Sequence, residues 1–283
     1  MTRRRIDLHT HSTASDGTTL PADLVRQARE AGLDVVALTD HDTTGGIAEA
    51  TAALPPGLTL VPGAEISCVS GTISLHLLAY LFDPAEPVFA AARRELRDSR
   101  VHRAERMVES LAAAGTGVTW PQVQRLAGGT VGRPHIARAL MEQGLVGSVS
   151  EAFSAEWVGA GGPHFRDKLE LEVVGAVRLV LAAGGVPVFA HPSATTRGAT
   201  VADEVIEELA EAGLVGLEVD HEDHTPADRD RLRALAGRLG LLCTGSSDFH
   251  GTHKNVALGA NTTVEAVYEQ LVARATGDVV RTA

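Results

Sequence analysis

Short apolar runs alternate with amphipathic stretches along most of the chain, which is the pattern of strands that alternate with helices. Strand-like runs cover residues 6–8, 35–38, 58–61, 186–190, 215–219 and 241–244, and a hairpin over residues 68–81 turns at Ser70-Gly71. Helix-like stretches cover residues 21–31, 47–53, 171–183, 201–212, 225–239 and 264–276. About seven strands with helices between them favour an α/β fold of the (β/α) barrel type over an open doubly wound sheet.

The alternation stops between residues 86 and 164, where no segment has the character of a strand. A long arginine-rich amphipathic helix is predicted over residues 86–114, and shorter helices over 121–127, 134–143 and 150–158, separated by glycine-rich joints. We therefore expect two domains. Residues 1–85 and 165–283 would form a barrel that carries the active site, and residues 86–164 would form an all-helical insertion that acts as a cap.

Histidine and carboxylate side chains gather where predicted strands end. They are His9 and His11 after the first strand, His41 after the second, Glu65 after the third, and His191, Asp248 and His250 after later strands. The segments that follow the strands of a parallel barrel lie on one face, so these residues should converge. Imidazole and carboxylate together bind borderline divalent metals. One His-x-His or His-Pro motif would mean little, but the joint placement predicts a site for more than one metal.

Composition narrows the possible partners. The 283 residues are 44% hydrophobic and carry a formal net charge of -11, which supports a real core and does not favour binding to long nucleic acid. A short nucleotide held by metals and a few arginines remains compatible with this charge. No secretory signal and no apolar run of about 20 residues is present, so we expect a cytoplasmic protein that does not enter a membrane. Cys68 and Cys243 follow no metal-binding spacing and are predicted to be reduced thiols.

Five motifs together resemble those of the PHP family (polymerase and histidinol phosphatase). They are His9-Thr10-His11 with Ser15-Asp16-Gly17, Thr39-Asp40-His41, Gly63-Ala64-Glu65, His191-Pro192, and Ser247-Asp248-Phe249-His250. Within the family, the chain is similar to bacterial enzymes that act on nucleoside 3',5'-bisphosphates and trim short RNAs from the 5' end. Residues 38–45, 132–137 and 218–225 fit that group. The resemblance implies a distorted (β/α)7 barrel with an all-helical insertion and a trinuclear metal centre.

The resemblance also implies which residues bind the three divalent ions. The first metal would take His9, His11, Glu65 and Asp248; the second Glu65, His76 and His191; the third Asp16, His41 and His250. Mixed nitrogen and oxygen ligands fit manganese, iron or zinc, and the resemblance favours manganese or iron. The chain departs from the pattern of the family at two places, and both concern the expected substrate contacts. Asp220 stands where relatives suggest a tyrosine-like residue, and residues 193–197 lack the expected Arg-Tyr pair.

Positive groups opposite the metals would bind the phosphate. Substrate-binding candidates are Arg100, Arg103, Arg133, His135, Arg197 and His221, of which Arg133 and His135 are also the candidate catalytic residues. Pro134, between Arg133 and His135, is typical of a helix start, and a helix N-terminus attracts phosphate. For Arg100 and Arg103, a solvated helix face is an equally good explanation.

These residues predict a metal-dependent phosphoesterase that hydrolyses nucleotide phosphate esters with a hydroxide bridging the metals. The expected substrates are a small phosphorylated nucleotide or the end of a short RNA. A histidinol-phosphate phosphatase, a metal-dependent hydrolase of C–N bonds and a non-catalytic metal-binding module remain alternatives. The oligomeric state is not predicted.

Overall fold

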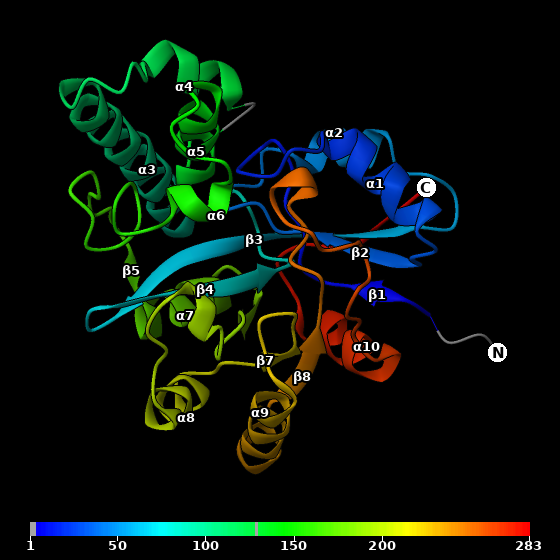
Figure 1. Ribbon diagram of the computed structural model, residues 1–283. Helices are drawn as coiled ribbons and strands as arrows, with labels where there is room; N and C mark the ends of the chain where they lie inside the picture. The colour runs from blue at the N-terminus through cyan, green and yellow to red at the C-terminus, as the bar shows by residue number, and fades with distance from the viewer. Residues whose placement is uncertain (1–3, 128–129) are drawn as a thin grey trace.

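A nearly closed barrel of seven strands forms the centre of the molecule. The computed structural model describes residues 4–127 and 130–283 (Figure 1). The strands, in spatial order, are β1 (Ile6–Asp7), β2 (Val35–Leu38), β3 (Thr59–Ser70), β4 (Ile73–Tyr80), β6 (Val186–Phe189), β7 (Gly216–Asp220) and β8 (Leu242–Gly245). The predicted fold class is confirmed. Two short strands that the sequence did not predict, β5 (Leu171–Glu172) and β9 (Arg281–Thr282), pair with β3.

The barrel is distorted because the predicted hairpin is part of its wall. Strand β4 runs antiparallel to both β3 and β6, whereas the other neighbours along the barrel are parallel. The gap between the first and last strands is bridged by the segments that follow them. Thr10 pairs with Phe249 in a parallel bridge, and the amide of His11 donates to the carbonyl of Phe249 at 2.8 Å. Closure therefore places the first and last histidine motifs side by side.

Helices surround the barrel as the apolar periodicity predicts. They are α1 (Pro21–Glu30), α2 (Ile47–Ala52), α7 (Val173–Ala182), α8 (Asp203–Glu211), α9 (Pro226–Leu239) and α10 (Glu265–Arg274), with the 3-10 turns η1 (Thr195–Arg197) and η2 (Gly251–His253). Helix α9 shows the local causes clearly. Thr225 and Asp228 form a capping box at its start, and Gly240 ends it at a φ of 70°, where a side chain would be strained.

The segment between β4 and β5 is helical in the described residues. It contains α3 (Pro87–Ala113), α4 (Trp120–Leu126), α5 (Arg133–Glu142) and α6 (Val149–Ala152), which group together beside the barrel in Figure 1. These helices share a hydrophobic core of their own that includes Met107, Leu111, Ile136 and Leu140. Gly128 and Gly129, in one of the predicted glycine-rich joints, lie outside the described residues.

Two sequence-based predictions about element boundaries are wrong. The helix predicted over residues 150–158 ends at Ala152, and Val158 then donates back to the Ala152 carbonyl at 3.0 Å, so the chain continues as turns. Glu65 does not follow a strand but lies inside the continuous strand β3. Pro62 and Gly63 resembled a strand end, yet β3 only changes partner there, from β2 to β4. A Cβ on Gly63 would lie 2.8 Å from the Ala79 oxygen, so glycine permits this close pairing.

Candidate metal centre

All nine candidate metal ligands lie in one connected group of buried or half-buried side chains. They are His9, His11, Asp16, His41, Glu65, His76, His191, Asp248 and His250. Strand ends supply most of them, as the sequence predicts, while Glu65 and His76 come from the middle of the β3–β4 hairpin. Every one of them has an imidazole nitrogen or carboxylate oxygen within 3.7 Å of another member of the group.

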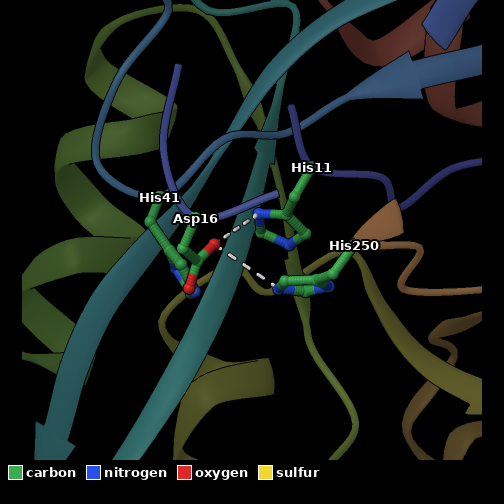
Figure 2. Close-up of side chains that lie close together, drawn as sticks. All are labelled: His11, Asp16, His41 and His250. Atoms are coloured by element: carbon green, nitrogen blue, oxygen red, sulfur yellow. Dashed lines mark ion pairs between the residues drawn. The ribbon is translucent and has the colours of Figure 1, made fainter. Parts of the chain in front are cut away.

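Asp16 forms one part of this group together with three histidines (Figure 2). Its Oδ1 atom lies 3.7 Å from His11 Nδ1 and 3.5 Å from His250 Nε2, and its Oδ2 atom lies 3.6 Å from His41 Nε2. The candidate ligand atoms of these four residues all lie within 4.8 Å of one another. Such a cluster is compact enough to hold one ion.

Glu65 occupies the centre of the rest of the group. Its Oε1 atom lies 2.9 Å from His76 Nδ1 and 3.0 Å from His191 Nε2, whereas Oε2 lies 3.3 Å from His9 Nε2. His9 and His11 in turn lie 3.4 Å and 3.3 Å from Asp248 Oδ1. The two oxygens of Glu65 thus face different sets of nitrogens, which is the arrangement that a carboxylate needs to bridge two ions.

Several buried atoms in the group lack a hydrogen bond. Among the described residues, Asp248 Oδ1, His41 Nδ1 and His76 Nδ1 have no hydrogen-bond partner, although the two nitrogens lie near Glu65. Leaving buried polar atoms unpaired is costly, and a cation at this position would satisfy them. The donor set of six histidines and three carboxylates also fits a borderline divalent metal.

The carboxylates of the group are held in the charged form that metal binding requires. Burial alone would raise the pKa of Asp16. The nearby His41, His250 and His11 outweigh that effect, so the pKa lies well below its usual value. The pKa values of Glu65 and Asp248 are also well below the usual range, because histidines around Glu65 and Lys254 beside Asp248 outweigh the effect of burial. These acids are therefore ready to accept positive charge.

Local backbone geometry helps to aim the ligands. His191 and Asp248 have φ values of 31° and 53°, a left-handed region that costs free energy for residues other than glycine. The Nδ1 atom of His250 donates to the Asp248 carbonyl at 2.8 Å, so its Nε2 atom is left to face Asp16. Strain at candidate ligands indicates that the surrounding structure holds them in place.

Arg100 and Arg103 are not on a solvated helix face, since their exposed fractions are only 5% and 4%. Arg100 donates from Nε to Asp42 Oδ2 at 2.6 Å and from a terminal nitrogen to Ser67 Oγ at 2.7 Å. Asp42 is itself buried and follows the candidate ligand His41 in the chain. The long helix α3 therefore contacts the residue that follows the candidate ligand His41.

Arg103, Arg133 and Lys168 each lie close enough to Arg100 for its charge to lower their pKa values. With Arg100 they make up a cluster of four cationic side chains that we call the cation cluster. Burial, then Arg133 and Arg100, lower the pKa of Arg103 to about 9. Burial, then Arg100, lower the pKa of Lys168 to about 8. Lys168 pairs with Glu170 at 2.6 Å, whereas Arg103 forms no ion pair with any residue that the structure describes. Among the described residues, only Asp42 and Glu170 form ion pairs with these four cations. The excess of positive charge favours an anionic ligand.

Arg133 and His135 begin helix α5, as the sequence predicts. The guanidinium of Arg133 lies over the ring of Phe153, 4.8 Å from its centroid. His135 is buried, and its Nδ1 atom accepts a 2.9 Å hydrogen bond from the amide of Gly132. Burial also lowers the pKa of His135 to about 4, so the ring is neutral. This capping contact gives His135 a structural task at the helix start, beside Asp16.

Arg197 and His221 lie next to Asp248, another candidate ligand. Arg197 donates to Asp248 Oδ2 at 2.6 Å, and His221 Nε2 lies 3.4 Å from the same oxygen. Lys254 also donates to this oxygen, at 2.5 Å. Sequence reasoning missed Lys254, Lys168 and Asp42 as members of the site. Only Asp42 carried a signal in the sequence, because it directly follows the candidate ligand His41.

A barrel that brings six histidines and three carboxylates together, with a cation cluster beside them, defines a metal-dependent phosphoesterase, a phosphoric ester hydrolase. The PHP domain matches residues 7–116. The chain is 35% identical over 248 residues to the 3',5'-nucleoside bisphosphate phosphatase of Chromobacterium violaceum, with 87% of each chain covered. It therefore belongs to the PHP family, as its motifs suggested.

Two further comparisons agree with this assignment. The chain is 33% identical over 259 residues to the 5'-3' exoribonuclease of Haemophilus influenzae, which covers 91% of this chain and 94% of that one. A predicted metal-dependent phosphoesterase of Bifidobacterium adolescentis has a solved structure that superposes with a TM-score of 0.91, at 37% identity and with 96% of this chain and 97% of that one covered. No helix within the described residues is both long and apolar enough to cross a membrane.

Proposed function

We propose that this enzyme hydrolyses phosphate esters of nucleoside 3',5'-bisphosphates and of the 5' ends of short RNAs. The observation that carries the proposal is Arg103, a buried guanidinium that forms no ion pair with the described residues and lies in a cation cluster beside the metal-ligand group. A bisphosphate has one phosphate for the metal ions that the group would hold and one for the cation cluster. The names of the two relatives at 35% and 33% identity support the same substrate class.

The metal-ligand group is proposed to hold three divalent ions, manganese or iron, and its donor set is also compatible with zinc. One would take His9, His11, Glu65 and Asp248; another Glu65, His76 and His191; and the third Asp16, His41 and His250. The central position of Glu65, with its two oxygens facing different histidines, supports a bridging role. Divalent ions held there would supply Lewis-acid chemistry, which activates water and neutralises the oxygens of a phosphoryl group during in-line displacement.

The protein side chains would bind and orient the substrate. Arg100 is fixed by Asp42 and Ser67 before any ligand arrives, so little side-chain entropy is lost when it meets a phosphate. Arg103 and Lys168 would bind the second phosphate, and Arg133 would stabilise charge on the reacting one as a catalytic residue. Arg197 and His221 are proposed to contact the substrate from the Asp248 side. For His135, the hydrogen bond from Gly132 favours positioning of the loop beside Asp16.

Residues 86–164 are proposed to be a separate cap domain that limits substrate length. Their own hydrophobic core and the contacts of Arg100 with Asp42 and Ser67 of the barrel support this role. The test is to compare rates on a nucleoside 3',5'-bisphosphate and on a long structured RNA at equal concentration. A bisphosphate rate at least about tenfold higher is expected, and equal rates on both would contradict the proposal. Cytoplasmic action remains a prediction from the sequence.

The alternative substrates fit the site less well. Histidinol phosphate carries an amine that is positively charged at neutral pH, and four cationic side chains near the metals would repel it. A hydrolase of C–N bonds would have no use for the cation cluster. Release of phosphate from histidinol phosphate at a rate comparable to that from the bisphosphate would reverse this choice.

A further inference from the structure

Glu218 is a fully buried carboxylate behind the metal-ligand group, and the roles proposed above do not use it. It lies on β7, and its side chain is 0% exposed. His9 Nδ1 lies 3.0 Å from Glu218 Oε1, and the backbone amide of His191 donates to Oε2 at 2.8 Å. The hydroxyl of Ser246 donates to Oε1 as well. Both oxygens are therefore occupied by donors of the protein itself.

The contact with His9 determines which ring nitrogen carries the proton. A carboxylate only accepts, so the Nδ1 atom of His9 must be the donor. In the neutral ring the Nε2 atom then keeps its lone pair, and it points toward Glu65 and Asp248, at 3.3 Å and 3.4 Å. Neutral imidazole protonated on Nδ1 is the form that binds a metal through Nε2.

The contact with His191 acts on the backbone. His191 has a φ of 31°, which is strained for a residue with a side chain, and its amide hydrogen bond to Glu218 helps to hold this conformation. The strained backbone aims the ring so that Nε2 lies 3.0 Å from Glu65 Oε1. One carboxylate thus contacts two candidate ligands from different strands.

We infer that Glu218 is a positioning residue that fixes His9 as its Nδ1-protonated tautomer and holds the His191 backbone, so that both Nε2 atoms face the metals. The inference rests on the proposed ligand assignment, in which His9 and His191 serve different ions. Glu218 would then couple two metal positions without touching either metal. Its loss should weaken metal binding at both.

The test variant is Glu218→Gln, which keeps the size of the side chain but replaces one oxygen with a donor. The three donors around the side chain, from His9, Ser246 and the His191 amide, then have only one oxygen left to accept their hydrogen bonds. The amide NH2 must oppose either the His191 amide or His9 Nδ1, and the second choice forces the His9 proton onto Nε2, where it blocks the metal. The matched control is Asp220→Asn on the same strand, where the carboxylate pairs with Arg233 at 2.9 Å on the surface.

Two measurements on the full chain separate this role from a general structural one. Competition with a chelator gives the Mn²⁺ affinity, which should fall about 10- to 100-fold in Glu218→Gln and stay within about twofold in Asp220→Asn. Long-range ¹H–¹⁵N spectra of the metal-free protein report the histidine tautomers. We expect His9 protonated on Nδ1 in the unchanged protein and a changed signal in Glu218→Gln.

Either of two results would overturn the inference. One is Mn²⁺ binding by Glu218→Gln within twofold of the unchanged protein. The other is a His9 ring without a proton on Nδ1 in the unchanged protein, a measurement that needs no variant and so stands even if Glu218→Gln does not fold. Failure of the proposed substrate class would leave both readouts intact, because neither depends on turnover.

Discussion

Arg100 of helix α3 donates a 2.6 Å hydrogen bond from Nε to Oδ2 of Asp42, the residue directly after the candidate metal ligand His41. Both side chains are buried, so the helical segment is joined to the metal-ligand group by an ion pair that water does not screen. The contact fixes the cation cluster relative to the candidate metals. The proposed substrate contacts and the candidate metal ligands therefore belong to one buried site.

Replacing Asp42 with alanine should destabilise the protein by about 3–5 kcal/mol, because the buried charge of Arg100 is left without its partner. Chemical denaturation monitored by circular dichroism measures the free energy of unfolding. The matched control is Asp98→Ala, which removes an exposed acid from the same helix α3 and should change stability by no more than about 0.5 kcal/mol. Equal effects of the two substitutions would show that the buried pair does not join the segments.

Replacing Arg103 with methionine should stabilise the protein and impair substrate binding at the same time. A buried, unpaired donor costs about 1–3 kcal/mol, which an apolar side chain of similar length avoids. Loss of the guanidinium should raise KM for a nucleoside 3',5'-bisphosphate at least about tenfold and change kcat less. Thermal unfolding and steady-state kinetics give both values. Arg94→Met, on the exposed side of α3, is the control, and a KM for Arg103→Met equal to that of the control would exclude Arg103 from the substrate site.

Lys168 should make substrate binding sensitive to alkaline pH. Burial, then Arg100, lower its pKa to about 8, so the amine is charged below that pH and neutral above it. As the pH rises through about 8, kcat/KM should fall, because the neutral amine attracts phosphate less. Lys168→Arg stays charged throughout this range and should lose less activity between pH 7 and 9. If the two pH profiles coincide, Lys168 does not contact the substrate.

Replacing Glu65 with glutamine should remove most of the activity by weakening the binding of more than one ion. The amide keeps the size of the side chain but cannot offer two anionic oxygens to the histidines around it. Turnover should fall by more than about 100-fold, since removal of residues that merely support ligands already costs 10- to 100-fold. Elemental analysis of the purified variant should show less bound metal than in Glu208→Gln, a surface control on α8. Full metal content with full activity would exclude Glu65 as a ligand.

The convergence of the histidine motifs could be predicted from the sequence because barrel topology alone dictates it. His9, His41 and His191 follow strands, and parallel strands end on one face whatever their exact lengths. Glu65 was placed wrongly at a strand end because Pro62 and Gly63 usually mark a break, whereas here they mark a change of partner strand.

The cation cluster could be predicted only in part. Arg100 and Arg103 lie on an amphipathic helix, and sequence periodicity does not distinguish a buried polar face from a solvated one. Lys168 lies in a segment without periodicity, between the helical segment and β5. Its membership depends on packing between distant parts of the chain, for which a single sequence contains no local signal.

The most direct test of metal-dependent phosphoester hydrolysis is phosphate release from adenosine 3',5'-bisphosphate. The protein is first freed of metal with a chelator and then titrated with Mn²⁺. We expect no release above background without metal, and a rate that rises with Mn²⁺ and levels off near three equivalents per chain. Undiminished phosphate release from the metal-free protein, or no release at any Mn²⁺ concentration, would contradict the assignment.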